Sequence, residues 1–212
     1  DMSMDTAPAP TLNDWQMSLP AEPSPTFNDA SWKTTDDPQQ MGADGDNSAF
    51  AWYRASVQAP QAGTGTLHFQ GAADHLIVFV NGKRVVATPS SADLKPHSDE
   101  LRDGKLSWTA SADFVAGKNV IAVLATHQGR DKAGGYWGPI DHYYEKGIFK
   151  PVDLQIAGQT IPVKGWKMHG GLPDPANLHF ISPMDKDLPA IGAPVFYRAT
   201  FTAPRPNIGA NP

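Results

Sequence analysis

Short apolar runs, broken by Gly, Pro, Asn or Asp, make up most of this chain from Trp15 onward. Residues 50–57 (FAWYRASV) are rich in aromatic and small apolar side chains. Residues 65–70 alternate, with Leu67 and Phe69 on one face and polar residues on the other, which is the period of a half-buried strand. No stretch of sequence keeps an apolar stripe of helical period for three turns. The pattern therefore predicts strands joined by turns.

The clearest local signal is a hairpin at residues 75–86 (HLIVFV-NG-KRVV). Asn81-Gly82 separates two apolar runs, and both positions of a two-residue hairpin turn need a positive φ, which Asn and Gly tolerate. Because residues 76–80 are apolar on both faces, they predict a central strand. Residues 119–125 (NVIAVLA) predict a second core strand, and further strands are expected at residues 106–110, 148–156 and 160–163.

Composition agrees with an all-β fold. Gly and Pro number 19 and 20 among 212 residues, and so many turn formers disfavour long helices. Hydrophobic residues make up 40% of the chain, which is enough for a core. We expect an antiparallel β-sandwich of the jelly-roll type, with two sheets packed face to face. Five tryptophans in or beside strands are expected in the core: Trp15, Trp32, Trp52, Trp108 and Trp166.

The sequence also repeats itself. Residues 52–60 (WYRASVQAP) match residues 196–204 (FYRATFTAP) without a gap, and a Trp-x-Met lies upstream of each copy, at 15–17 and 166–168. These echoes suggest a tandem duplication of one β domain. The arginine of each copy, Arg54 or Arg198, has aromatic neighbours and is expected to form a structural ion pair or to stack on a ring.

The repeat predicts the domain boundaries. Residues 1–12 read as a linker, 13–165 as the jelly roll, and 166–212 as a linker followed by the first strand of a second, truncated copy. A lone strand cannot bury both of its faces, so it must pair with the first domain, pair with another copy of the chain or stay loose. We expect the chain to be a fragment of a larger protein.

Charge and cysteine content limit the function. The net charge is 17 − 22 = −5 with no basic run, which disfavours nucleic-acid binding. The chain has no cysteine, so disulfides, cysteine-based zinc sites and thiol catalysis are excluded. No apolar run approaches the ~20 residues of a membrane span. The absence of an Asn-x-Ser/Thr sequon disfavours a eukaryotic secreted protein, and an exported bacterial protein, periplasmic or extracellular, is favoured.

Several short motifs occur in an order that resembles a known family. They are FNDASW at 27–32, WYR at 52–54, FVNGK at 79–83, GKNVIAVL at 117–124, KGI at 146–148 and WK-x-x-GGL at 166–172. Together they resemble the galactose-binding-like jelly-roll domains that follow the catalytic barrel in glycoside hydrolase family 35 β-galactosidases, over roughly residues 13–204. The sugar-binding-like β domain of family 2 glycoside hydrolases shares WYR, VNGK and GKN-x-IAVL and stays open as an alternative.

The resemblance implies a parent enzyme that hydrolyses terminal β-galactosides with retention, using two glutamates on a (β/α)₈ barrel. No strand–helix alternation in this chain suggests such a barrel, and none of Glu22, Glu100 and Glu145 lies in a matching motif. No catalytic residue is therefore assigned, and no cofactor is expected. The partners implied are the barrel and other domains of the same parent chain. Asp141 and Glu145 form the one carboxylate pair worth inspecting.

The loop 126–147 is the candidate ligand site. It is long, rich in Gly and aromatic residues, and long loops in compact domains are usually functional. Aromatic rings stack on the C–H faces of sugars while polar groups bond the hydroxyls. The candidate carbohydrate-binding residues are Arg130, Tyr136, Trp137, Asp141, His142, Tyr143 and Tyr144. The alternative is that these rings pack against a neighbouring domain.

A weaker candidate is a calcium site at Asp44, Asp46 and Ser48, which place hard oxygen ligands at alternating positions. A turn before the next strand explains the same residues without metal, and no other metal site is expected. Three roles thus remain: a non-catalytic accessory scaffold of a β-galactosidase, which we favour; an autonomous carbohydrate-binding module for galactosides or other glycans; and an enzyme in its own right.

Overall fold

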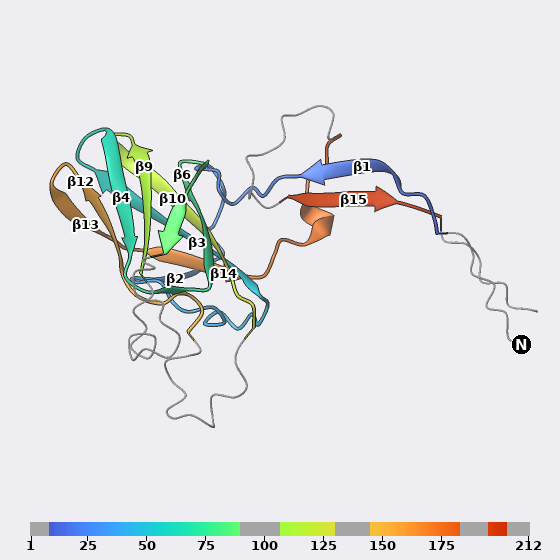
Figure 1. The fold of residues 1–212 in the computed structure, drawn as a ribbon, viewed down its shortest axis with the longest axis horizontal. Helices are drawn as coiled ribbons and strands as arrows, with labels where there is room; N and C mark the ends of the chain where they lie inside the picture. The colour runs from blue at the N-terminus through green and yellow to red at the C-terminus, as the bar shows by residue number, and fades with distance from the viewer. Residues whose placement is uncertain (1–8, 90–106, 130–144, 183–194, 203–212) are drawn as a thin grey trace, which may run out of the picture. The chain divides into compact units, whose positions relative to one another are not determined.

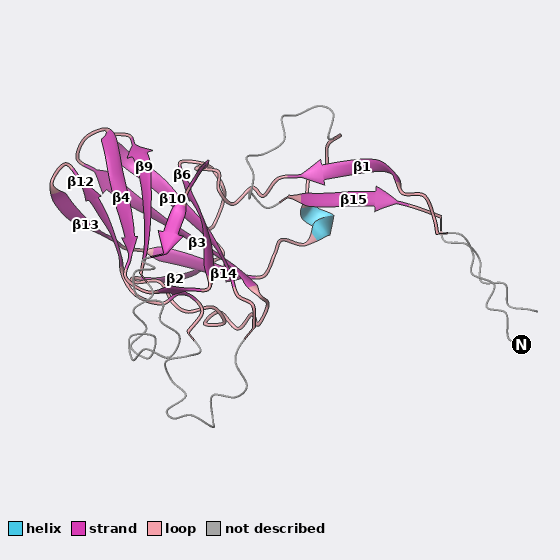
Figure 2. Cartoon of the chain, viewed as in Figure 1, coloured by secondary structure: helices cyan, strands magenta, loops and turns pink. Residues whose placement is uncertain are grey.

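The computed structural model describes residues 9–89, 107–129, 145–182 and 195–202. These residues form strands and loops, and their helical structure is limited to the 3₁₀ turn η4 (Pro175–Asn177) (Figure 2). The predicted all-β fold is confirmed. None of the described residues forms a helix long and apolar enough to cross a membrane. The chain divides into two compact units, one of residues 21–173 and one of residues 1–20 with 174–212.

The first unit is a sandwich of two antiparallel sheets (Figure 1). In order across the six-stranded sheet lie β2 (Lys33–Thr35), β14 (Trp166–Gly170), β3 (Phe50–Ala59), β10 (Gly117–Thr126), β6 (His75–Val80) and β7 (Lys83–Val85). In order across the five-stranded sheet lie β13 (Gln159–Val163), β12 (Val152–Ile156), β4 (Gly63–Phe69), β9 (Trp108–Phe114) and β8 (Ala87–Pro89). The short strands β5 (Ala72–Ala73) and β11 (Gly147–Ile148) pair with each other at one end.

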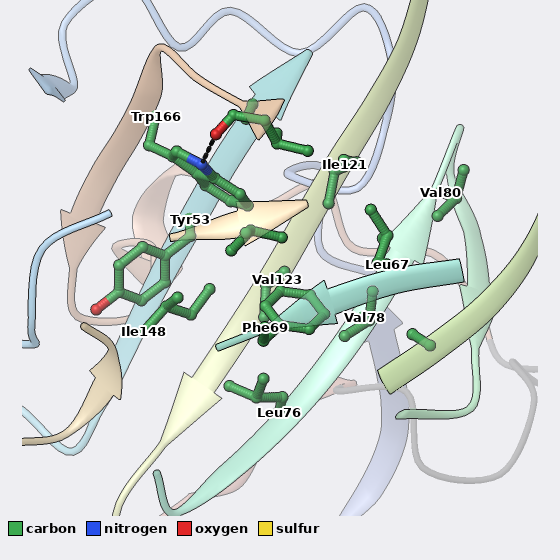
Figure 3. Close-up of a cluster of buried hydrophobic side chains, with 14 of the residues drawn as sticks. Tyr53, Leu67, Phe69, Leu76, Val78, Val80, Ile121, Val123, Ile148 and Trp166 are labelled. Atoms are coloured by element: carbon green, nitrogen blue, oxygen red, sulfur yellow. Dashed lines mark hydrogen bonds between the residues drawn. The ribbon is translucent and has the colours of Figure 1, made fainter. Parts of the chain in front are cut away.

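The main core lies between the two sheets, because each strand turns alternate side chains inward. Figure 3 shows inward residues of both sheets meeting, among them Tyr53 and Val123 of the six-stranded sheet and Leu67 and Phe69 of β4. Trp166 is buried there and donates its ring N–H to the carbonyl of Val163 at 2.9 Å. At ~25 cal/mol per Å² of buried apolar surface, this interface is the main source of stability.

The outer face of the six-stranded sheet carries a second, smaller core. Trp52, Phe79 and Leu124 point away from the main core and are buried together with Trp32. Trp32 ends a segment, residues 21–32, that covers this face, and its ring meets that of Phe27 edge-on at 5.4 Å. The central strands β3 and β10 are therefore buried on both faces, which accounts for their continuous apolar runs.

The predicted hairpin is confirmed. Asn81 and Gly82 have φ values of 49° and 82° and connect β6 to β7. The Asn81 amide also donates to Oδ1 of Asn119 at 2.8 Å, while its own Oδ1 accepts from the Val120 N–H at 2.9 Å. Asn119 is fully buried and further bonds the N–H and carbonyl of Val115. The turn is thus fastened to the strand beside it.

Other predicted strands are confirmed with shifted bounds. Residues 160–163 lie in β13, whereas the single strand expected at 148–156 is two, β11 and β12, separated by Pro151, whose missing N–H cannot join a ladder. The strand expected at 106–110 is observed as β9, Trp108–Phe114, and residue 106 lies outside the described part of the chain.

The second unit contains an antiparallel ribbon of β1 (Asn13–Ser18) and β15 (Phe196–Thr200). The repeated strand therefore has a partner, which comes from residues that the sequence assigned to the first domain. The compact sandwich runs from Ala21 to Pro173, compared with the expected 13–165. Four of the five tryptophans are buried as predicted, but Trp15 is 47% exposed, so its assignment to the core is wrong.

Candidate functional site

The predicted carbohydrate-binding residues fall outside the described residues. All seven lie within residues 130–144, namely Arg130, Tyr136, Trp137, Asp141, His142, Tyr143 and Tyr144. The residues on either side, 126–129 and 145–148, are described, and we call them the loop stem. The stem is the part of the candidate site whose geometry the structure describes, and sugar binding by the loop stays a prediction.

Asp74 joins the two sides of the loop stem. Its Oδ2 accepts the N–H of Gln128 at 3.1 Å on the incoming side. Its Oδ1 accepts Nζ of Lys146 at 2.7 Å on the outgoing side. The Lys146 side chain is only 13% exposed, so this ion pair is shielded from water more than a surface pair and is correspondingly stronger. One carboxylate thus holds both ends of a loop that spans more than fifteen residues.

A second segment, residues 41–49, bonds both sides of the same stem. The Met41 N–H donates to the Lys146 carbonyl at 2.8 Å, and the His127 N–H donates to the Ala49 carbonyl at 3.0 Å. The stem is therefore fixed by backbone bonds from one side and by the Asp74 carboxylate from the other. This arrangement gives the intervening loop fixed starting and ending points.

Close packing explains the glycine of the Lys-Gly-Ile motif. Gly147 has φ of 75°, and a Cβ there would lie 2.4 Å from the hydroxyl of Tyr53. Only glycine allows both the backbone conformation and the approach. Tyr53 is fully buried and donates its hydroxyl to the Gln39 carbonyl at 2.8 Å. Burial raises the pKa of the Tyr53 hydroxyl above its ordinary value, so it stays a neutral donor.

The candidate calcium ligands are engaged in local hydrogen bonds. Asp44 accepts the N–H of Asp46 through Oδ1 and that of Gly170 through Oδ2. Asp46 accepts the Ser48 N–H at 2.7 Å, and Ser48 donates its hydroxyl to the Phe50 carbonyl. Hydrogen bonding with Ser48 lowers the pKa of Asp46. Within the described ranges no three His, Cys, Asp or Glu side chains gather as a metal site, and calcium binding here stays a prediction.

Gly170, the last residue of β14, packs against the same turn. A Cβ on Gly170 would come 2.3 Å from Cβ of Asp46, so the glycine lets β14 lie directly against the acidic turn. The Gly171 N–H then donates to the Phe50 carbonyl at 2.7 Å. The Gly-Gly pair of the Trp-Lys-x-x-Gly-Gly motif therefore serves close packing between the last strand of the sandwich and the turn that holds the stem.

Arg54 is the centre of a buried polar network on the outer face of the six-stranded sheet. Its Nε donates to Asp29 at 2.8 Å, and its terminal nitrogens donate to the carbonyls of Glu22 and Ser24. Lys167 donates to the other oxygen of Asp29 at 2.6 Å. Burial alone would raise the pKa of Asp29, but the hydrogen bonds and charges of Lys167 and Arg54 outweigh it and hold the pKa below its ordinary value.

The network is structural, as expected for Arg54. The guanidinium also lies over the ring of Phe27, with Cζ 5.3 Å from the ring centroid, so it ties the covering segment to the sheet. Two buried polar atoms, Oε2 of Glu22 and Nε1 of Trp52, have no hydrogen-bond partner among the described residues. Burial raises the pKa of Glu22, which therefore favours the protonated acid more than an exposed glutamate does.

Sequence reasoning missed Asp74. It is a single carboxylate before an apolar strand, and its two partners lie 54 and 72 residues further along the chain. Lys146 borders the long loop, but Asp74 lies between two strands far earlier in the sequence, so no local pattern links the two residues. Of the carboxylate pair singled out earlier, Glu145 is half-buried at the stem, and Asp141 lies outside the described residues.

The chain is similar in structure to parts of several solved proteins, two of which are described here. The chain is similar to a beta-glycosidase from Bacteroides vulgatus, with 19% identity and a TM-score of 0.39 over 68% of this chain and 19% of that one. It is also similar to a GH2 beta-galacturonidase from Eisenbergiella tayi bound to glycerol, with 15% identity and a TM-score of 0.37 over 78% of this chain and 36% of that one. The chain thus spans well under half the length of either protein. No family model and no curated protein sequence matches it.

Proposed function

We propose that the sandwich of residues 21–173 is a non-catalytic accessory domain of a glycoside hydrolase, of the β-galactosidase type that the sequence resembles. One observation carries the proposal: the motif residues behind the resemblance use their polar groups inside the sandwich. Arg54 bonds the covering segment, and Asn81 and Asn119 bond each other. Catalytic groups must instead reach a substrate. The motifs therefore mark a fold that supports other parts of an enzyme.

The outer face of the five-stranded sheet supports the same role. Its polar side chains pair with one another across strands: Thr64 with Asp113 at 2.8 Å, and Gln70 with Asp153 at 2.6 Å. The polar groups of such a face are paired or hydrated, so it needs no ligand or partner to cover it. The loop between residues 130 and 144 is then the candidate contact with a catalytic barrel in the same parent chain.

The second candidate function is an autonomous carbohydrate-binding module, and the geometry of the loop stem favours it. A binding loop gains affinity when its ends are held in place before the ligand arrives, because less conformational entropy is lost on binding. Asp74 and the 41–49 segment hold the ends in this way. In this reading Trp137 and its aromatic neighbours would stack on galactosides.

A heteronuclear NMR titration of the full chain with galactose and short galacto-oligosaccharides separates the two functions. The scaffold proposal expects no saturable shifts at millimolar sugar. Saturable shifts at residues 126–129 and 145–148, lost in Trp137→Ala but kept in the control Trp15→Ala, would overturn it in favour of the binding module. Both variants should retain the unfolding midpoint of the parent chain.

A hydrolysis assay tests the absence of catalysis. Pure chain should not release a chromophore from an aryl galactoside above the rate of buffer. Hydrolysis that disappears in Asp141→Asn or Glu145→Gln, with the fold intact by circular dichroism, would make this chain an enzyme in its own right and reject the accessory role.

A further inference from the structure

Over Gln16 to Ser18, the ribbon of the second unit repeats the register of a pair of strands in the sandwich. In the sandwich β14 pairs with β3 so that Lys167 lies opposite Arg54 and Met168 opposite Tyr53. In the ribbon β1 pairs with β15 in the same sense, with Gln16 opposite Arg198 and Met17 opposite Tyr197. The sequence repeat thus extends to hydrogen-bond register, which sequence similarity alone does not guarantee.

Local geometry on both sides of the pair also repeats. A residue of positive φ precedes each Trp-x-Met, Gly165 at 68° in the sandwich and Asp14 at 54° in the ribbon. The methionine then meets a further strand on its other side: Met168 pairs with Lys33 of β2, and Met17 forms a bridge with Ile181. Three adjacent strands of the sandwich, β2, β14 and β3, therefore have counterparts in the second unit. These are Ile181, β1 and β15.

Each of the two arginines lies over a phenylalanine ring. Arg54 lies over the ring of Phe27, and Arg198 lies over the ring of Phe180, 4.0 Å from its centroid. Arg198 also donates twice to Oε1 of Gln16, the residue opposite it, at 2.7 and 3.2 Å. The second unit thus reproduces one edge of the sandwich together with part of its covering segment.

What differs is burial. Tyr53 is fully buried, whereas its counterpart Tyr197 is 55% exposed. Val57 is 4% exposed, whereas the matching Phe201 is 57% exposed. Trp166 and Trp15 differ in the same way, at 1% and 47%, while Met17 is buried like Met168. Large apolar side chains left in water at equivalent positions mark a surface that is built to be covered.

We propose that β1 and β15 are the last and first strands of a second sandwich of the same plan, split around the complete one. The open surface, defined by Trp15, Tyr197 and Phe201 together with the outer edge of β15, accepts the counterparts of β4 to β13. In the complete sandwich β10 pairs with the corresponding edge of β3, and an apolar five-stranded sheet covers Tyr53 and Val57. The occupant is therefore a β-sheet half-sandwich.

The order of elements assigns the source of this occupant. In the sandwich the covering segment, β2 and β3 follow one another within residues 21–59. In the second unit residues 174–181, which include the bridge at Ile181, and β15 follow one another in the same order. The counterparts of β4 to β13 would then follow β15 in the polypeptide, and β1 would close the sheet from the other side of the insertion. This inference rests on the strand register and burial, and it stands or falls independently of the proposed accessory function.

A graft tests the inference. Residues 1–204 are followed directly by a second copy of residues 61–165, because Ala203-Pro204 matches Ala59-Pro60. Hydrogen exchange is measured on peptides covering residues 13–18 and 196–201. We expect both peptides to be slowed at least tenfold relative to the chain without the graft, and a monomer with a second cooperative unfolding transition. The control is the same graft carrying Met17→Lys, which should lose the second transition and keep the first.

A second graft guards against a simple packing mismatch. Phe201→Val restores the residue that faces the covering sheet in the complete sandwich, so it should fold at least as well as the first graft. Failure of both grafts to protect residues 13–18 and 196–201 would overturn the proposal. So would a chain without the graft that dimerises at micromolar concentration with both peptides protected, because the occupant would then be a second copy.

Discussion

Two pairs of strands in this chain share sequence and register but not environment. In the sandwich, Tyr53 lies on β3 beneath the five-stranded sheet and is fully buried; in the ribbon, Tyr197 lies at the same position of β15 and is 55% exposed. The difference shows that local sequence determines which strands pair and in which register. Burial, which supplies most of the stability, comes from the opposite sheet.

The two arginines extend the comparison to polar groups. Arg54 is 3% exposed and needs Asp29 and two backbone carbonyls to satisfy its guanidinium. Arg198 is exposed and meets one neutral glutamine, Gln16. A charge without water requires a charged partner, whereas a charge in water does not. If a facing sheet and covering segment buried Arg198, its guanidinium would need more hydrogen-bond partners than Gln16 alone.

The largest contrast is expected for the two tryptophans. Trp166→Ala should destabilise the sandwich by about 3–5 kcal/mol, because a large side chain leaves a cavity and the Val163 carbonyl loses its donor. Trp15→Ala should change the same unfolding transition by less than ~0.5 kcal/mol, as exposed positions usually do. Urea unfolding followed by circular dichroism measures both. Equal losses of stability in the two variants would show that Trp15 stabilises the sandwich. The ribbon and the sandwich would then not unfold independently.

The arginines come next. Arg54→Met should destabilise the sandwich by ~3 kcal/mol, at the lower end for a broken buried ion pair, because Asp29 keeps Lys167 as a partner. Arg198→Met should cost less than ~1 kcal/mol in any transition. The urea midpoints of the two variants give the comparison. A small effect of Arg54→Met would mean that the covering segment is held by its aromatic contacts alone.

Sequence patterns predicted the fold wherever the signal was local. The Asn81-Gly82 turn and the apolar run of β10 are specified by neighbouring residues, and both are observed as expected. Trp15 is expected in the core because it lies in or beside a predicted strand, yet a strand pattern says nothing about whether a facing sheet is present to cover the side chain. The pairing of β1 with β15 joins residues ~180 positions apart, which no local pattern reveals.

The candidate site was less predictable. Asp74 holds the loop stem through partners brought together only by the packing of β5, β10 and β11. The acidic turn was recognised, but its oxygens bond backbone N–H groups, including that of Gly170, which lies 126 residues away. Composition identified the aromatic loop as a candidate site, and its residues 130–144 lie outside the described part of the chain.

Replacing Asn119 tests how much β10, which has no counterpart in the described ribbon, contributes to stability. Asn119 lies on β10, and its amide makes four hydrogen bonds, including one from Asn81. Asn119→Ala should cost ~2 kcal/mol, because it removes four hydrogen bonds of a fully buried side chain, including those to the N–H and carbonyl of Val115. Asn47→Ala, at an exposed position, is the matched control and should be neutral. In a double-mutant cycle Asn81→Gly should lose most of its own effect once Asn119 is replaced. Additive effects would mean that the turn and β10 are stabilised separately.

The smallest expected effect is a dependence of stability on pH. We expect it from the Arg54–Asp29 pair of the sandwich and not from the Arg198–Gln16 pair of the ribbon. Lys167 and Arg54 hold the pKa of Asp29 below its ordinary value in the folded sandwich, against the opposing effect of burial. Because the folded pKa is lower than the value of ~3.9 in the unfolded chain, this network stabilises the sandwich above that pH and loses its contribution as the pH falls through the folded pKa. The corresponding pair in the ribbon, Arg198 and Gln16, contains no carboxylate. Asp29→Asn should therefore reduce stability at pH 7 more than at pH 3, and the gap between variant and parent should narrow as acid is added. Urea midpoints between pH 3 and 7 give the two curves, with Gln16→Ala as a control whose difference from the parent should not vary with pH. A constant gap for Asp29→Asn would show that the carboxylate is not selectively stabilised in the fold, and the contrast between the charged pair and the neutral one would then have no measurable consequence.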